Sequence, residues 1–233
     1  SAASKTAHRE GRQEGGSVRD GTKQTQAAEV PERAIQAADT PDRDWSWVEA
    51  SVWTERMLAA LGNGVKGGKW FSLMDKATRP TTLAAAWRKV ASNGGAAGVD
   101  RQSIERFAAK SGEYLGELAR SLEERSYQPQ PVRRVEIPKG DGKTRPLGIP
   151  TVKDRIVQTA LKFALEPIFE AQFRETSYGF RPGRGCKDAL REVDRLLKEG
   201  YTFVVDADLA GYFDSIPHER LMRRVEERIS DGA

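Results

Sequence analysis

Three carboxylates follow a short apolar run near the end of the 233-residue sequence. The run, residues 201–205, is rich in β-branched and aromatic side chains, which is typical of a buried strand. The acids are Asp206, Asp208 and Asp214. In an extended strand Asp206 and Asp208 would face the same side, where two carboxylates need a cation or a proton. Mg²⁺ takes one or two protein carboxylates together with water and substrate phosphates, so the pattern indicates part of a magnesium site. The alternative is that these acids cap a turn.

A basic hairpin is predicted over residues 132–149. Apolar and polar side chains alternate there on both sides of a glycine-rich turn at residues 139–143. Five cations lie on the hairpin or beside its turn: Arg133, Arg134, Lys139, Lys143 and Arg145. Arginine offers a planar fork to two phosphate oxygens and lysine a compact charge, so the hairpin could hold a triphosphate. A hairpin whose charged side chains are simply solvated is the open alternative.

Residues 177–185 mix aromatic and arginine side chains in a glycine-rich loop. The aromatic residues are Tyr178 and Phe180, and the arginines are Arg181 and Arg184. Aromatic faces stack on bases and arginines contact phosphates, so the loop could hold a single-stranded template or primer. The alternative is a turn whose two aromatic side chains plug the core.

The spacing of apolar residues divides the chain into a polar extension and a helix-rich body. Residues 1–43 contain almost no large apolar side chains and are expected to be flexible. Helical spacing recurs before and after the hairpin, with Asp44 and Asp154 as expected N-caps, and a last helix is expected after Pro217. Helices, a hairpin, more helices, one strand and a final helix predict a mixed α+β fold rather than a regular parallel α/β sheet.

The composition favours an intracellular protein and permits a polyanionic partner. The sequence has 38 basic and 34 acidic residues, a net charge of +4, and 38% hydrophobic residues, which can supply a core. The single Cys186 allows no internal disulfide. The sequence has no run of about 18 apolar residues, so no membrane segment is expected and we predict a cytoplasmic location.

Five motifs, taken in order, resemble the reverse transcriptases encoded by group II introns. They are the loop at residues 93–100 (Asn-Gly-Gly-Ala-Ala-Gly-Val-Asp), the hairpin, residues 154–158 (Asp-Arg-Ile-Val-Gln), the loop at residues 177–184, and residues 206–214. In that family the fold is a right hand of fingers, palm and thumb, and the enzyme copies RNA into DNA with Mg²⁺. The intron-encoded members also bind their own intron RNA and assist its splicing, which is called maturase activity.

The resemblance implies a domain organisation and a set of partners. Residues 1–43 would be a flexible extension, 44–110 the N-terminal helical extension of the reverse transcriptase, 111–200 the fingers and 201–233 the start of the palm. The expected partners are an RNA template or intron RNA, a DNA primer and deoxynucleoside triphosphates, with no membrane. A homo-oligomer is compatible with this interpretation.

The resemblance also implies roles for individual residues. Asp208 matches the first palm aspartate, a catalytic ligand of both metal ions, with the backbone carbonyl of Leu209 beside it. Lys139 and Arg145 match the residues that hold the incoming triphosphate. Phe213 matches the aromatic residue that selects deoxyribonucleotides. Contacts to the template or intron RNA are expected from Asn93, Gly94, Gly95, Arg181 and Arg184.

One part of the family pattern is missing. The second palm motif, an aromatic-Ala-Asp-Asp turn, does not occur, and the sequence contains no Asp-Asp pair. Asp206 and Asp214 are expected to support the site rather than to replace that motif. We therefore expect that this chain alone cannot polymerise. Two alternatives stay open: an RNA-binding module without chemistry, and a domesticated retroelement or CRISPR-associated reverse transcriptase.

Overall fold

The computed structural model describes residues 44–140, 142–209 and 211–231. The extension predicted at residues 1–43 lies outside the described residues. The described residues all belong to one unit, Glu32–Ala233. None of the helices in this part of the chain is long and apolar enough to cross a membrane.

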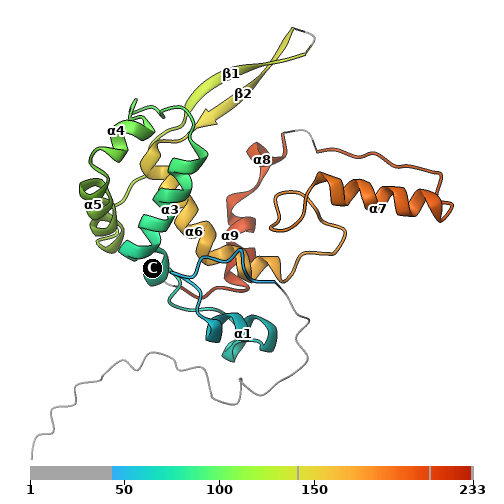
Figure 1. Cartoon of the computed structure of the whole chain (residues 1–233), viewed down its shortest axis with the longest axis horizontal. Coiled ribbons are helices and arrows are strands. Elements are labelled where there is room, and N and C mark those ends of the chain that lie inside the picture. Colours follow the sequence, from blue (N-terminus) through green and yellow to red (C-terminus); the bar gives the residue numbers. More distant parts are fainter. Residues whose placement is uncertain (1–43, 141, 210, 232–233) are drawn as a thin grey trace, which may run out of the picture. The chain divides into compact units, whose positions relative to one another are not determined.

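Helices dominate the described part of the chain, and one hairpin interrupts them. In chain order the elements are α1 (Glu55–Asn63), the 3-10 helix η2 (Lys66–Gly68), α2 (Met74–Ala77), α3 (Pro80–Asn93), α4 (Ile104–Ala108), α5 (Ser111–Glu123), β1 (Arg133–Lys139), β2 (Lys143–Ile149), α6 (Val152–Glu170), α7 (Cys186–Lys198), α8 (Tyr212–Ser215) and α9 (His218–Glu226). The strands β1 and β2 form an antiparallel pair (Figure 1). The predicted helix-rich α+β class with a β-hairpin is confirmed.

The first hydrophobic core forms around α3, which packs against both α5 and α6. Its most buried side chains are at most 2% exposed and come from four helices: Leu83, Phe107, Leu118 and Ile156. The ring of Phe107 lies between those of Trp87 and Tyr114, at centroid distances of 4.6 and 5.2 Å. Burying each side chain of this size stabilises the fold by about 1.5–3 kcal/mol, so this core fixes α6, which begins shortly after β2 ends.

A second core joins the segment before α1 to the later turns of α6. Val52, Trp53 and Leu73 are buried in it together with Ile168. The indole nitrogen of Trp53 donates to the carbonyl of Phe163 at 2.8 Å, which satisfies the polar atom of an otherwise apolar side chain.

The last described residues return to this second core. The backbone nitrogen of Trp70 donates to the carbonyl of Arg228 at 2.8 Å, and that of Ser230 donates to the carbonyl of Trp70 at 2.9 Å. The carboxylate of Asp231 accepts hydrogen bonds from two backbone amides at the start of α2, at 2.6 and 2.8 Å. Helix amides at that position lack partners within the helix, so the contact ties the segment after α9 to the N-terminal part of the body.

Two helix starts differ from the sequence-based expectation. The N-cap of α6 is Thr151 rather than Asp154, because the hydroxyl of Thr151 accepts from the backbone nitrogen of Asp154 at 3.1 Å. Asp44 caps no helix; it accepts from the backbone nitrogen of Ser46 at 2.8 Å in a turn. The first helix begins only after Thr54, whose side chain caps it.

The strand predicted at residues 201–205 is absent from the structure, and that prediction is wrong. Residues 201–209 have no regular secondary structure and all are exposed, including Phe203 at 98% and Val205 at 91%. A strand forms by hydrogen bonding to a neighbouring strand, and among the described residues β1 and β2 pair only with each other. The same-side argument for Asp206 and Asp208 therefore has no strand to rest on.

Candidate nucleotide and nucleic-acid interface

The register of the hairpin gathers three exposed cations on one face, together with the half-buried Arg133 at the start of β1. Lys139 pairs with Lys143, and Ile137 pairs with Arg145. Residues opposite each other share a face, as do residues two apart on one strand, so Lys139, Lys143 and Arg145 lie on the same face. All three are exposed, and among the described residues no ion pair involves them. This face can receive an anion with several phosphate oxygens.

The opposite face of the hairpin carries a cation that is already paired. Arg134 lies one residue out of phase with the first set, and its Nε donates to the Oε1 of Glu136 at 2.9 Å. Both side chains are largely exposed, so the pair adds little stability, but it reduces the positive charge of that face. One face of the hairpin therefore carries unpaired positive charge, whereas the positive charge of the other face is partly neutralised.

The loop at residues 94–98 follows Asn93, which is the last residue of α3 rather than part of the loop, and it is held from outside by two arginines. Arg155 on α6 donates from Nη1 to the carbonyl of Gly94 at 3.1 Å and from Nη2 to that of Ala96 at 2.8 Å. Arg133, at the start of β1, donates from Nε to the carbonyl of Ala97 at 2.9 Å. The loop is thus joined to the base of the hairpin and to the start of α6, which follow it by at least 36 residues in the sequence.

Arg155 is partly buried where it makes these contacts. Burial lowers the pKa of its guanidinium, while the charge of Asp100 opposes that effect. Its Nε is buried and has no hydrogen-bond partner among the described residues. An arginine so placed is committed to the loop carbonyls, and its role is to position the loop.

Asp154 joins α6 to the segment that leads into β1. It is 4% exposed and accepts hydrogen bonds from the hydroxyls of Thr151, at 2.6 Å, and Tyr127, and from the backbone nitrogen of Gln130. Burial and the contact with Asp154 raise the pKa of Tyr127 above its ordinary value. A buried carboxylate with three donors is well satisfied, so Asp154 anchors this segment rather than serving as a free acid.

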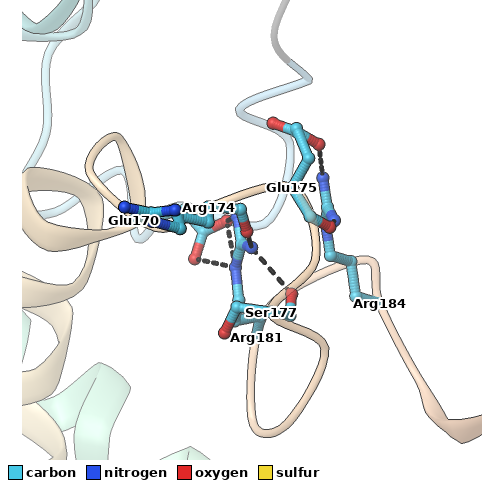
Figure 2. A network of polar contacts seen from close by, with 6 residues as sticks. All are labelled: Glu170, Arg174, Glu175, Ser177, Arg181 and Arg184. Carbon is cyan, nitrogen blue, oxygen red and sulfur yellow. Dashed lines mark hydrogen bonds and ion pairs between the residues drawn. The ribbon is translucent and has the colours of Figure 1, made fainter. Parts of the chain in front are cut away.

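The loop after α6 is closed by two arginines of its own, as Figure 2 shows. Arg181 is 9% exposed and forms an ion pair with Glu170, with its Nη2 2.6 Å from Oε1. Its Nη1 also donates to the carbonyls of Arg174 and Ser177 at 2.7 and 2.8 Å. The hydrogen bonds to Glu170 raise the pKa of Arg181. These contacts occupy its guanidinium, so Arg181 supports the loop from within.

The second arginine of this loop lies closer to the surface. Arg184 contacts the carboxylate and the carbonyl of Glu175 (Figure 2). Its guanidinium also lies 5.7 Å from the centre of the Tyr178 ring. Tyr178 is half-buried, whereas the side chain of Phe180 is fully exposed at 101%. The sequence-based alternative in which both aromatic residues plug the core is therefore wrong for Phe180.

The acidic segment at residues 206–214 does not form a complete metal site in the described part of the chain. The Oδ1 of Asp208 accepts from the backbone nitrogen of Leu209 at 2.9 Å, and both residues are exposed. Phe213 on α8 is 81% exposed, with its ring 5.4 Å from that of Tyr212. Among the described residues no three His, Cys, Asp or Glu side chains come together as a group that could hold a metal ion. The carboxylate of Asp208 and the carbonyl of Leu209 are oxygen donors of the kind that Mg²⁺ takes, so they fit part of its coordination.

The structure therefore brings together some of the expected site residues. Lys139 and Arg145 share a face, and the loop that contains Gly94 is bonded to the base of the same hairpin through Arg133. No hydrogen bond or ion pair within the described segments joins Asp208 to the hairpin. Sequence reasoning missed the role of Arg155, although it noted the motif at residues 154–158.

Comparison with known protein families identifies the class of protein that this chain resembles. Residues 137–231 match the family described as reverse transcriptase (RNA-dependent DNA polymerase). This range includes most of the hairpin, both closing arginines of the later loop, and Asp208 with Phe213.

The individual proteins that resemble this chain include several encoded by introns. The chain is 38% identical over 156 residues to the group II intron-encoded protein LtrA of Lactococcus lactis, covering 66% of this chain and 25% of that protein. It is 45% identical over 161 residues to protein YkfC of Escherichia coli, covering 66% of this chain and 42% of that protein. A 91 kDa protein in a cob intron of Schizosaccharomyces pombe is 38% identical over 117 residues, which is 50% of this chain and 14% of that protein. The resemblance to group II intron reverse transcriptases is confirmed, and the chain spans less than half the length of these relatives.

Proposed function

We propose that this chain is the N-terminal part of an RNA-directed DNA polymerase of group II intron type. The observation that carries the proposal is the reverse transcriptase match over residues 137–231. The intron-encoded relatives favour this function over an RNA-binding module without chemistry. In this proposal residues 44–110 are the N-terminal helical extension, 111–200 the fingers and 201–233 the start of the palm.

The hairpin would hold the incoming deoxynucleoside triphosphate. Lys139 and Arg145 would contact its phosphates from the face that they share. Arginine suits paired phosphate oxygens and lysine a single one, so the two residues are complementary rather than redundant. This supports the role that the family resemblance implies for both.

The acidic segment would supply half of the catalytic centre. Asp208 and the carbonyl of Leu209 would bind Mg²⁺, which supplies positive charge to the triphosphate and the primer hydroxyl when bound. The ring of Phe213 would lie under the sugar and exclude a 2′-hydroxyl. The other carboxylates would come from a second acidic motif, which this sequence lacks.

The two loops would contact RNA. Asn93 at the end of α3, with Gly94 and Gly95 in the clamped loop, would face the template or intron RNA, and the loop closed by Arg181 and Arg184 would contact the same strand. In a longer parent protein these contacts would serve both reverse transcription and splicing. Such contacts to phosphates would make RNA binding depend steeply on salt.

Primer extension on an RNA template with Mg²⁺ and deoxynucleoside triphosphates tests the proposal. The 233-residue chain alone should not extend a DNA primer. A chimera that continues this chain with the corresponding later part of LtrA should extend it, and Asp208→Ala should abolish that activity, whereas Asp214→Asn should retain part of it. Extension that persists in the Asp208→Ala chimera, or robust synthesis by the 233-residue chain alone, would contradict the assignment.

A further inference from the structure

Phe180 has the most exposed large apolar side chain in the described part of the molecule, at 101%. Its backbone is also in the left-handed region, with φ of 57°, which costs a residue other than glycine about 1–2 kcal/mol. Burying a ring of this size would gain about 1.5–3 kcal/mol, so the isolated chain forgoes that stabilisation as well. Neither cost is explained by a contact of Phe180 within the described residues.

The exposure of Phe180 does not come from a loosely attached loop. The next residue, Arg181, is 9% exposed and is held by Glu170 and by two backbone carbonyls of the same loop (Figure 2). A second closure joins Arg184 to Glu175. The hydrogen bonds of Arg181 to two carbonyls of the loop hold the backbone next to Phe180, so the point from which its ring projects is defined.

The surroundings of the ring suit a flat ligand. The same loop carries a second ring with a cation beside it: the guanidinium of Arg184 lies 5.7 Å from the ring centre of Tyr178. The neighbour Gly179 has no side chain, and a Cβ built there would meet nothing within 4 Å, so the approach beside Phe180 is open. A single flat ring with an open approach is enough for one nucleobase.

We propose that Phe180 is a stacking platform for one unpaired base of single-stranded nucleic acid, held in position by the ion pairs of Arg181 and Arg184. This inference rests on the RNA-binding part of the proposed function and adds a residue to which the family resemblance gave no role. Stacking of this kind tolerates any base and either sugar, since every base has a flat face. RNA and DNA strands should therefore depend on Phe180 to a similar degree.

The test is a binding titration of the 233-residue chain with single-stranded RNA of roughly 20 nucleotides, followed by fluorescence anisotropy. Phe180→Ala should weaken binding by about 5- to 150-fold, the range that corresponds to the loss of one stacked base. Phe180→Trp should retain the affinity and Phe180→Leu should not, because leucine is apolar but not flat. Phe71→Ala is the matched control, since Phe71 is also exposed, at 49%, but lies outside this loop.

An abasic scan of the same oligonucleotide makes the test specific for a base. Removing the base that stacks on Phe180 should weaken binding to the parent chain but not to the Phe180→Ala variant, as expected for two groups that interact directly. A leucine variant that binds as well as the tryptophan variant would overturn the proposal in favour of a protein-covered ring. Unchanged binding by Phe180→Ala would overturn this inference alone, whereas a parent chain that binds no RNA would overturn it together with the RNA-binding part of the proposed function.

Discussion

Gly98 lies against the backbone of Thr151 so closely that a side chain there would have no room. A Cβ built on Gly98 would be 2.6 Å from the Cα of Thr151 and 2.7 Å from its nitrogen. Thr151 is itself 1% exposed and caps α6, so its backbone is not free to move away. The contact explains why the loop at residues 94–98 reaches the start of α6, where Arg155 can hold it.

Substituting Gly98 should destabilise the whole chain. Gly98→Ala forces a methyl group against backbone atoms, and overpacking of this kind typically costs about 1–3 kcal/mol. Gly116→Ala is the control, because Gly116 lies on the exposed side of α5 with nothing within 4 Å of a built Cβ, and alanine there should stabilise the helix by about 0.5–1 kcal/mol. Urea denaturation measures both effects, and a Gly98→Ala variant as stable as the parent would contradict the close approach.

The arginine clamp should control the order of the loop more than the stability of the core. Arg155→Lys keeps a positive charge but cannot reach the carbonyls of Gly94 and Ala96 together, so it should raise hydrogen exchange at residues 94–98. Single-stranded RNA binding should weaken with it, because a disordered loop loses entropy on binding. Arg120→Lys, on the exposed surface of α5, is the control and should change neither property. Exchange in the loop that is equal in Arg155→Lys and the parent would show that the clamp is unnecessary.

The hairpin and the clamp differ in how far the sequence could predict them. The hairpin depends on an alternating pattern and a glycine-rich turn within fewer than twenty residues, which a single sequence displays directly. The clamp joins Arg155 to carbonyls 61 and 59 residues away, and a backbone carbonyl has no signature in the sequence. The motif at residues 154–158 is visible in the sequence, but the role of its second residue, Arg155, follows only from the fold.

The strand predicted at residues 201–205 is wrong for a different reason: the sequence pattern is present, but the strand does not form. Its composition is that of a strand, but composition reports only what a segment can do when a partner strand is available. In the described residues no such partner is present, and Phe203 and Val205 remain exposed. Arg181 shows the same limit for side chains, since an arginine in a glycine-rich loop is indistinguishable in sequence from one that contacts phosphate.

The contact between Tyr127 and Asp154 predicts a loss of stability at alkaline pH. Burial, together with this hydrogen bond, raises the pKa of Tyr127 in the folded chain above the value of about 10 in the unfolded chain. The stabilising contribution is therefore complete below pH 10 and declines as the pH rises toward the folded pKa, because the unfolded chain loses its proton first. Tyr127→Phe should remove this part of the decline and cost about 0.5–1.5 kcal/mol at neutral pH.

Urea titrations between neutral pH and about pH 11 measure this difference. The control is Tyr201→Phe, since the side chain of Tyr201 is 65% exposed and the substitution should leave the stability at neutral pH unchanged. Parallel profiles for the parent and Tyr127→Phe would mean that the tyrosine titrates equally in both states, and the anchoring role of its hydroxyl would have to be abandoned.

The two faces of the hairpin provide the sharpest test of triphosphate binding. Lys139 and Arg145 share one face with no ion pair among the described residues, whereas Arg134 lies on the other face and is paired with Glu136. Arg145→Ala and Lys139→Ala should each weaken binding of a deoxynucleoside triphosphate with Mg²⁺ about tenfold, the effect of about 1.4 kcal/mol from a charged contact.

Arg134→Ala removes the same charge from the same strand pair, and its effect should stay within about twofold because its guanidinium points away from the shared face. Isothermal titration calorimetry at two salt concentrations distinguishes a direct phosphate contact from the long-range attraction of the net positive charge. Added salt screens the long-range attraction, so it should reduce that part of each variant's effect on affinity to the same degree. Equal weakening by Arg134→Ala and Arg145→Ala would mean that only the net charge of the hairpin matters. The geometric role of its register, and with it the assignment of Lys139 and Arg145, would then be lost.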